Sequence, residues 1–465
     1  KEYSLEKLKL FENDEISEEL IDFFTTFKQR FETFQKNEKI EKLMSSIYKN
    51  RDLLKYKKQI ILQGPPGTGK TREAKLIAKE MLGLNSVEDL NENEQFKLIQ
   101  FHPSYTYEDF VRGIVAESKG DKIEYKNVNK TLGEFAKKAL KNKLDSEKDV
   151  SQLSKEMWLD EQFDKFVDYI SEEIEEKEEI KLTKSVYIIN TDEDAFRYKG
   201  KKGWSENGNR MLFKDIKTAF LDENVVRQDI KKNKNLSGLA HHHASYYIRV
   251  LDMFREFLKT ENLNFSQSNT IKKELKNYVL IIDEINRANL SSVLGELIYA
   301  LEYRGEAVES MYAVDEDNKL ILPPNLYIIG TMNTADRSVG HIDYAIRRRF
   351  AFVDVLPKDL SDDEDIVFDS KLFSSVKALF TTDDYKTHSV NLSKEFDPKD
   401  VALGHSYFIQ QYEKDEKGKE DKTKPIDFQM RLDYEIKPIL LEYVKDGILI
   451  GNDIIEKIEQ LETSI

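Results

Sequence analysis

The sequence predicts an α/β fold, in which a mostly parallel sheet is covered by helices and a smaller helical domain follows. Short apolar runs that are typical of buried strands alternate with segments of helical periodicity, as in sheets with helical crossovers. The first run, residues 59–63, leads into a glycine-rich turn and then a helical segment. From about residue 358 onward, apolar residues recur mainly at three-to-four spacing, which indicates helices.

Composition sets the broad class of the protein. The chain has 465 residues, 39% of them hydrophobic, with 26 Phe, 22 Tyr and no Cys. This length allows two or three domains, and the absence of Cys excludes disulfides, Cys-ligated metals and a thiol nucleophile. No apolar stretch approaches the about 18 residues of a spanning helix, so we expect a cytoplasmic protein with no membrane partner. A net charge of −15 argues against a general nucleic-acid coat.

The expected strands and domains follow in chain order. Residues 1–56 have helical periodicity, and because the chain begins with Lys1 rather than Met we expect further residues upstream. The α/β domain is expected over residues 57–357, with an insertion at about 142–275, and a helical lid over 358–465. The strand candidates are residues 59–63, 97–101, 278–282, 326–330 and 351–355.

The glycine-rich turn fits the pattern G-x-x-x-x-G-K-[ST] between a strand and a helix. It consists of Gly64, Pro65, Pro66, Gly67, Thr68, Gly69, Lys70 and Thr71. Glycines let backbone N–H groups surround phosphate oxygens, and the following helix directs its positive end toward them. Lys70 would reach the β- and γ-phosphates, and the Thr71 hydroxyl would join the Mg²⁺ shell. The turn therefore predicts binding of a nucleoside triphosphate with Mg²⁺.

Two carboxylates, Asp283 and Glu284, directly follow the aliphatic run that ends at residue 282. A buried strand would place them at the carboxyl edge of the sheet, where ligands bind in open parallel sheets. We expect Asp283 to hold Mg²⁺ through water and Glu284 to polarise the attacking water. Two solvated carboxylates after a strand are common by themselves, but together with the phosphate loop they predict hydrolysis.

Two further candidates carry weaker signals. Asn333 follows another strand candidate and could hydrogen-bond the γ-phosphate or its water, or it could only shape a turn. Arg347, Arg348 and Arg349 lie near the end of a helical segment and could simply complement the helix dipole. The alternative is an arginine finger, a planar cation offered to phosphate on a neighbouring subunit.

These motifs and two others occur in an order that resembles the McrB family, the AAA+ GTPase subunits of modified-cytosine restriction systems. The segments are GPPGTGKT, FHPSYTYEDFVRGI, LIIDEINRANLSSVLGELIYALE, YIIGTMNTADRSVGHIDYAIRRRF and GHSYF. Many families share the phosphate loop, but MNTADRS between DEINRAN and DYAIRRRF is far more specific. The resemblance covers roughly residues 50–142 and 276–450.

The resemblance implies an AAA+ P-loop NTPase with a helical lid that hydrolyses GTP rather than ATP and assembles as a hexamer. It also implies an McrC-like endonuclease partner and a motor that translocates DNA in a restriction or anti-phage system. The site residues that it implies, besides the phosphate loop, are Asp283 and Glu284 as the Walker B pair, Asn333 as sensor with Asp336 and Arg337 close behind, Arg348 and Arg349 as trans-acting arginines, and His405 near the nucleotide. Residues 114–128 and 307–324 would be hairpin insertions.

Some features stay open. The insertion is longer than the resemblance leads us to expect, and residues 1–56 are too few for a base-flipping pocket, so DNA recognition would lie upstream or on a partner. The phosphate motifs do not distinguish GTP from ATP, which leaves an ATP-dependent, MoxR-like protein-remodelling chaperone as the alternative. Within the insertion, we interpret His241–His243 as a solvated or packed cluster and residues 197–210 as a loop, in which Trp204 could stack on a base.

Overall fold

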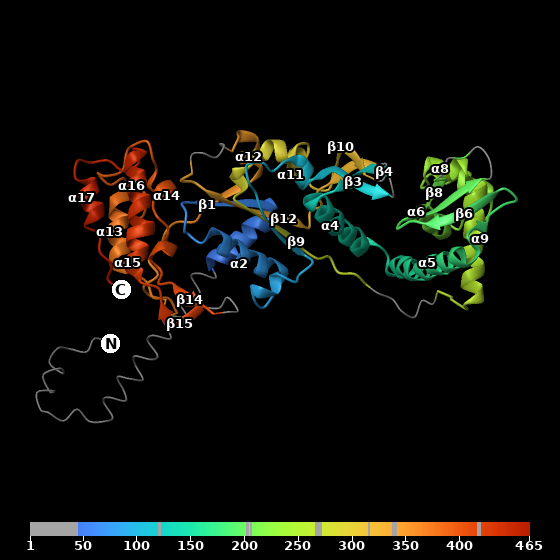
Figure 1. Ribbon diagram of the computed structural model, residues 1–465, viewed down its shortest axis with the longest axis horizontal. Coiled ribbons are helices and arrows are strands. Elements are labelled where there is room, and N and C mark those ends of the chain that lie inside the picture. The colour runs from blue at the N-terminus through green and yellow to red at the C-terminus, as the bar shows by residue number, and fades with distance from the viewer. Residues whose placement is uncertain are drawn as a thin grey trace, which may run out of the picture. The chain divides into compact units, whose positions relative to one another are not determined.

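A computed structural model describes residues 45–119, 122–200, 204, 207–265, 272–314, 317–336, 342–363, 365–415 and 420–465. Residues 1–44, which hold most of the expected N-terminal helical segment, lie outside the described residues, whereas residues 45–57 are helical. The chain divides into two compact units (Figure 1), Leu144–Glu274 and a larger one that joins Lys1–Lys143 to Leu275–Ile465.

The larger unit is built around a five-stranded sheet in which all neighbouring strands are parallel. In sheet order the strands are β13 (Ala351–Asp354), β1 (Gln59–Gly64), β12 (Leu326–Asn333), β9 (Tyr278–Asp283) and β2 (Phe96–Gln100). The predicted α/β class is therefore confirmed. Because the strands run in one direction, their carboxyl ends share an edge, where Gly64 lies beside Asn333 and Gln100 beside Asp283.

Helices cover both faces of this sheet. Alternate residues of a strand point to opposite faces, so Ile60 and Leu62 pack with α2 in one core, while Ile61 joins α4, α10 and α11 in the other. Burial on both faces explains why these strands are nearly continuous aliphatic runs in the sequence. The helical elements of this part are α2 (Lys70–Leu82), η2 (Glu88–Leu90), α3 (Tyr107–Phe110), α4 (Thr131–Glu147), η3 (Ile285–Arg287), α10 (Leu290–Leu294), α11 (Leu297–Glu302) and α12 (Tyr344–Arg349).

Two β-hairpins interrupt the alternation of helices and parallel strands, and they confirm the expected hairpin insertions. The buried Arg112 guanidinium joins them, because it donates to the main-chain oxygens of Tyr312 and Lys319, both at 2.9 Å, while its Nε donates to Asn129 at 2.9 Å. The Asn127 side chain adds a second link between the hairpins, because its Nδ2 donates to the main-chain oxygen of Ala313 at 2.9 Å. Their strands are β3 (Arg112–Lys119) with β4 (Lys122–Asn129) and β10 (Ala307–Val314) with β11 (Asp317–Ile321).

The C-terminal part is mainly helical and has its own apolar core, in which Phe380, Phe408, Leu432 and Leu440 are fully buried. A small hairpin, β14 (Tyr412–Lys414) with β15 (Glu420–Pro425), adds strands to this part of the chain, where the sequence indicates helices. The helical elements are α13 (Ser370–Phe380), α14 (Pro398–Val401), η4 (His405–Phe408), α15 (Phe428–Arg431), η5 (Leu432–Ile436), α16 (Lys437–Lys445) and α17 (Ile454–Glu459).

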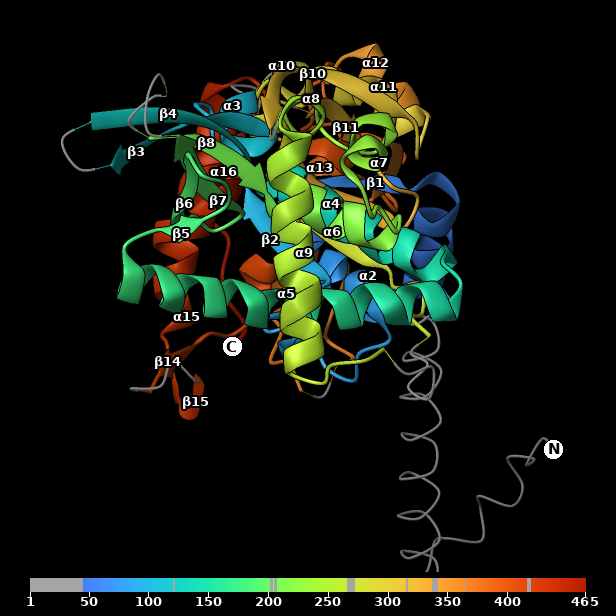
Figure 2. The same ribbon diagram turned by 90° about the vertical axis from the view of Figure 1, so that its right-hand side faces the viewer.

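The smaller unit, Leu144–Glu274, combines helices with a four-stranded antiparallel sheet. Figure 2 shows its two long helices, α5 and α9, crossing one another. Phe163 and Phe166 of α5, Phe196 of the sheet and Phe254 of α9 form an aromatic centre that fixes this crossing. Its elements are α5 (Val150–Lys177), β5 (Ile180–Lys181), β6 (Val186–Thr191), β7 (Ala195–Gly200), β8 (Asn209–Leu212), α6 (Phe213–Leu221), α7 (Arg227–Lys232), α8 (Gly238–His242) and α9 (Ala244–Thr260).

The loop predicted over residues 197–210 is wrong at its two ends, residues 197–200 and 209–210, which lie in strands. β7 and β8 are paired strands there, and Phe196, Tyr198 and Met211 are fully buried. The alternation of large apolar and polar residues along β7 has the period of a half-buried strand. The glycines and lysines that follow in the sequence concealed this pattern.

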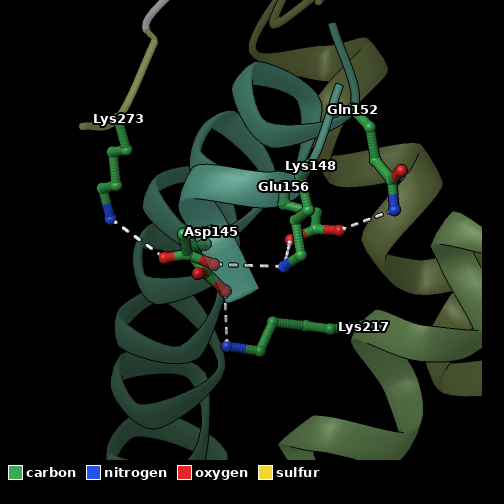
Figure 3. Close-up of polar contacts among 7 residues, drawn as sticks. Asp145, Lys148, Gln152, Glu156, Lys217 and Lys273 are labelled. Atoms are coloured by element: carbon green, nitrogen blue, oxygen red, sulfur yellow. Dashed lines mark hydrogen bonds and ion pairs between the residues drawn. The ribbon is translucent and has the colours of Figure 1, made fainter. Parts of the chain in front are cut away.

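The two ends of the smaller unit are tied by a buried carboxylate (Figure 3). Asp145 is only 5% exposed and pairs with Lys148 at 3.2 Å and with Lys273 at 3.1 Å. Burial opposes its ionisation, but the hydrogen bonds and charges of the two lysines outweigh burial and lower the pKa of Asp145. Lys148 also pairs with Glu156 of α5, so the cluster links the segment that enters the unit with the segment that leaves it.

We expect Asp145→Asn to lower the free energy of unfolding of this unit by about 1–3 kcal/mol, because the buried Asp145 loses the charge that pairs with two partly exposed ammonium groups. The pKa of Asp145 is lower in the folded chain, so this contribution is present above about pH 4 and is lost as the pH falls through the folded value. Urea unfolding followed by tryptophan fluorescence measures it, since both tryptophans of the chain, Trp158 and Trp204, lie in this unit.

Asp160→Asn is the matched control, because the side chain of Asp160 is 54% exposed and pairs with Lys217 at the surface. Exposed pairs contribute about 0–1 kcal/mol. Equal stability losses in the two variants would contradict the assigned role of Asp145.

Candidate nucleotide-binding site

The phosphate loop connects the end of β1 to the start of α2. Gly67 and Gly69 have φ angles of +79° and +77°, a left-handed conformation that glycine adopts without strain. Gly69 is the N-cap of the 13-residue helix α2, and no side chain caps that end. The loop therefore presents backbone donors and a helix N-terminus, which together suit an anion.

Lys70 is buried against its own loop. Its Nζ donates to the main-chain oxygens of Gly64 at 2.9 Å and Pro65 at 2.7 Å. Burial lowers the pKa of Lys70 to about 8, while the carboxylates of Glu284 and Asp283 act in the opposite direction. Further negative charge at the loop would stabilise the ammonium form, as a triphosphate would.

A hydroxyl and a carboxylate meet at the carboxyl edge of the sheet. Thr71 Oγ1 donates to Asp283 Oδ1 at 2.7 Å, and Thr331 Oγ1 donates to the same oxygen at 2.6 Å. The part of the chain that the structure describes contains no group of three or more His, Cys, Asp or Glu side chains that could hold a metal. Mg²⁺ usually takes one or two protein oxygens and completes its shell with water and phosphate. Thr71 and Asp283 fit that donor set.

Thr331 is a site residue that sequence reasoning missed. The strand register places it one position beyond the pair Gly330 and Ile282, and therefore beside Asp283. The main-chain N–H of Glu284 also donates to Thr331 Oγ1 at 3.1 Å. The available signal was a hydroxyl residue near the end of an otherwise aliphatic strand.

Glu284 follows β9 with a φ angle of +53°, which is rare for a residue with a side chain. Its carboxylate accepts from Arg287 Nε at 3.3 Å, and Arg287 also lies 3.8 Å from Asp336. Arg287 therefore links two acids that the sequence singled out separately, and no local pattern identified it. Arg337, the next predicted residue, lies outside the described residues.

Asn333 ends β12 beside Gly64 of the phosphate loop. Its side-chain oxygen accepts from the N–H of Ala335 at 3.2 Å, which shapes the turn after the strand. The N–H of Thr334 donates to the oxygen of Gly64 at 3.1 Å, so this turn is attached to the loop. Both interpretations of Asn333, a turn former and a group near the γ-phosphate, agree with this position.

The C-terminal helical part contacts the phosphate loop directly. The N–H of Gly404 donates to Pro66 at 3.0 Å, and the N–H of Ser406 donates to Gly67 at 2.9 Å. Between them, His405 is 8% exposed and its Nδ1 has no hydrogen-bond partner among the described residues. Burial, with the nearby charges of Lys358 and Arg72, lowers the pKa of His405 to about 4, so its imidazole is neutral at physiological pH. A buried, unpaired ring nitrogen at this position fits a polar ligand.

We expect Gly67→Ala to weaken nucleotide binding about tenfold or more. A Cβ there would lie 2.6 Å from Ser406 Oγ and 2.9 Å from the Tyr407 ring, at a φ of +79°. Titration with a fluorescent nucleotide measures the effect. Gly83→Ala is the matched control, since Gly83 has a φ of +67° but its Cβ would meet nothing within 4 Å. Similar losses in both variants would show that backbone strain, rather than the contact with residues 406–407, is responsible.

The predicted arginines lie away from the phosphate loop of their own chain. They end α12, and Ala351, two residues after Arg349, pairs with Ile60 near the amino end of β1, whereas the loop follows the carboxyl end of that strand. Gln59 Nε2 donates to the main-chain oxygen of Arg349 at 2.7 Å, which fixes this position. The structure therefore brings together Lys70, Thr71, Asp283, Glu284 and Asn333 but separates them from Arg348 and Arg349.

The histidines and Trp204 of the smaller unit have packing roles. His241 Nε2 hydrogen-bonds the main-chain oxygen of Asn233 at 2.7 Å, and His243 Nδ1 hydrogen-bonds the Tyr198 hydroxyl. The Trp204 ring packs against Tyr198, His243 and Tyr246. These contacts favour a structural role for the ring over base stacking.

The fold and the site define a P-loop NTPase of the AAA+ class, and sequence comparisons agree. The AAA domain of the dynein-related subfamily matches residues 59–153 and 224–350. The "Type IV methyl-directed restriction enzyme EcoKMcrB subunit" of Escherichia coli K12 is 38% identical over 192 residues, which is 39% of this chain and 40% of that protein. The "Type II restriction enzyme BsuMI component YdiS" of Bacillus subtilis 168 is 38% identical over 96 residues, 18% of this chain and 28% of that protein.

These similarities support a relationship between this chain and the McrB-like AAA+ proteins. The chain spans less than half of the length of both relatives. Among the residues that the structure describes, no helix is long and apolar enough to cross a membrane.

Proposed function

We propose that this chain is the GTP-hydrolysing motor subunit of a DNA restriction or anti-phage system, acting as a hexameric ring with an McrC-like endonuclease. The observation that carries the NTPase part is the separation of Arg348 and Arg349 from the phosphate loop of their own chain. A complete site then needs two copies, and hydrolysis depends on assembly. The restriction components among the relatives support the choice of system.

Each residue of the site has a specific task in this proposal. Backbone N–H groups of residues 67–71 bind the phosphate oxygens, and Lys70 neutralises their charge. Thr71 and Asp283 would hold Mg²⁺, which supplies further charge neutralisation when bound. Glu284 orients the attacking water and takes its proton. Asn333 lies where it can hydrogen-bond that water or the γ-phosphate.

The helical part, residues 358–465, acts as the lid in this proposal. Gly404 and Ser406 donate to the loop oxygens of Pro66 and Gly67, so the lid and the phosphate loop are directly coupled. His405 is the lid residue that we assign to nucleotide binding, because its neutral imidazole retains a buried nitrogen without a partner among the described residues.

The test compares hydrolysis of GTP and ATP by the purified chain, alone, with DNA, and with the product of the neighbouring endonuclease gene. We expect GTP to be preferred and turnover to rise with chain concentration and with the endonuclease subunit. A preference for ATP without a response to DNA or to that subunit would overturn the restriction proposal. That result would favour an ATP-dependent, MoxR-like remodelling chaperone.

A further inference from the structure

Glu302, the last residue of α11, holds both candidate trans-acting arginines. One of its carboxylate oxygens lies 3.3 Å from Arg348 Nη2 and 3.1 Å from Arg349 Nη2. Two adjacent guanidinium groups repel one another unless a negative charge lies between them. A single carboxylate therefore holds the pair together.

The backbone beneath this triad is fixed by residues around the start of β1. Lys57 Nζ donates to the main-chain oxygen of Arg348 at 3.1 Å. The buried amide of Gln59 donates to the main-chain oxygens of Arg349 at 2.7 Å and Leu301 at 3.1 Å. The ends of α11 and α12 are thus bound to one glutamine, which fixes the backbone next to Glu302 relative to the backbone of the arginines.

The two arginines are not equivalent. The Arg349 side chain is 11% exposed and also donates to the main-chain oxygen of Ala345 at 2.9 Å, so it is anchored in its own chain. The Arg348 side chain is 68% exposed, and its described side-chain contact is with Glu302. Arg348 is therefore the arginine that can reach another molecule, and Glu302 limits its conformations.

The surroundings favour an anion at this position. A cavity of about 280 Å³ lies beside the triad and is lined by Lys57, Lys58, Arg304, Arg348 and Arg349, with Glu302 as the one carboxylate among its described lining residues. The Glu302 side chain is 39% exposed. Partly exposed ion pairs contribute little net stability, so a triphosphate with several negative charges can displace this carboxylate from Arg348.

We infer that Glu302 is a positioning residue that orients Arg348 toward the γ-phosphate bound by a neighbouring copy of the chain. The inference rests on the proposed function. Glu302 acts through the arginine and touches neither nucleotide nor water. Its removal frees one long side chain, which then has to be immobilised again for every turnover.

The test is Glu302→Gln in the full chain at assembling concentrations. We expect kcat to fall about three- to tenfold, as the loss of one immobilised side chain predicts, with KM and nucleotide affinity unchanged. Glu302→Asp should recover part of kcat. Glu306→Gln is the matched control, because Glu306 lies four residues away and accepts from the Tyr299 hydroxyl. That control should behave as wild type.

A double-mutant cycle separates the inference from the function on which it rests. In an Arg348→Ala background, Glu302→Gln should cause no further loss, because the side chain that it positions is absent. A full additional loss in that background, or a Glu302→Gln kcat equal to that of Glu306→Gln, overturns the positioning role and leaves the proposed function standing. Wild-type turnover by Arg348→Ala overturns the trans-arginine proposal itself.

Discussion

Glu284→Gln should bind nucleotide normally and hydrolyse it about 10²- to 10⁴-fold more slowly, the range that a positioned general base contributes. Glu284 lies at the carboxyl edge of the sheet, next to the Asp283 that accepts from Thr71. Its N–H is held by Thr331 Oγ1 and its carboxylate by Arg287. Glutamine keeps the size of the side chain and its contact with Arg287 but cannot take a proton from water.

Single-turnover hydrolysis and fluorescent-nucleotide titration measure the two parts of this result separately. The control is Glu92→Gln, which removes an exposed carboxylate of the same unit outside the site. A kcat for Glu284→Gln equal to that of the control would exclude Glu284 as the general base. Loss of nucleotide binding would instead assign it a structural role in the site.

Arg348→Ala should bind nucleotide normally but lose turnover about 10³-fold, the lower end of the range for a trans-acting arginine. The reason is geometric. Arg348 precedes β13, whose first residue pairs near the amino end of β1, whereas the phosphate loop follows the carboxyl end of β1. Arg348 is therefore placed to act on a neighbouring copy rather than on its own site. Arg347→Ala is the matched control, because the Arg347 guanidinium lies over the Phe352 ring of its own chain. That variant should retain activity.

Mixing two inactive variants tests the same prediction through a gain of hydrolysis activity instead of a loss of activity. A Glu284→Gln copy still offers Arg348, and an Arg348→Ala copy still offers Glu284. In a mixed ring that assembles at random from equal amounts, about one quarter of the interfaces combine an intact Glu284 from one copy with an intact Arg348 from its neighbour. Activity should therefore return on mixing, and its absence in rings that demonstrably contain both variants would contradict action in trans.

The parts of the protein that follow from local sequence were predictable. Three patterns could be recognised within a few adjacent residues: the glycines of the phosphate loop, the aliphatic run before Asp283 and the aliphatic run before Asn333. Strand boundaries in the central sheet accordingly agree to within a few positions. The smaller unit was less predictable, because the strand around Tyr198 lies directly before a run of lysines and glycines, a composition that is typical of a loop.

Contacts between distant segments were not predictable. Thr331 binds Asp283 across two neighbouring strands, Arg287 lies between Glu284 and Asp336, and Glu302 pairs with Arg348 and Arg349, which lie far along the chain. None of these pairs has a sequence signature, because the order of parallel strands and the packing of helix ends bring the partners together.

The sequence by itself determined the phosphate-loop motif at a strand–turn–helix junction and the two carboxylates after the next aliphatic run, because the residues of each motif are adjacent in the chain and depend only on local geometry. Only the tertiary structure decided that the arginines lie away from the phosphate loop and that Gly404 and Ser406 of the C-terminal helical part are bound to it. The physical reason is the direction of β1, whose carboxyl end leads into the phosphate loop while its amino end fixes the backbone of Arg349.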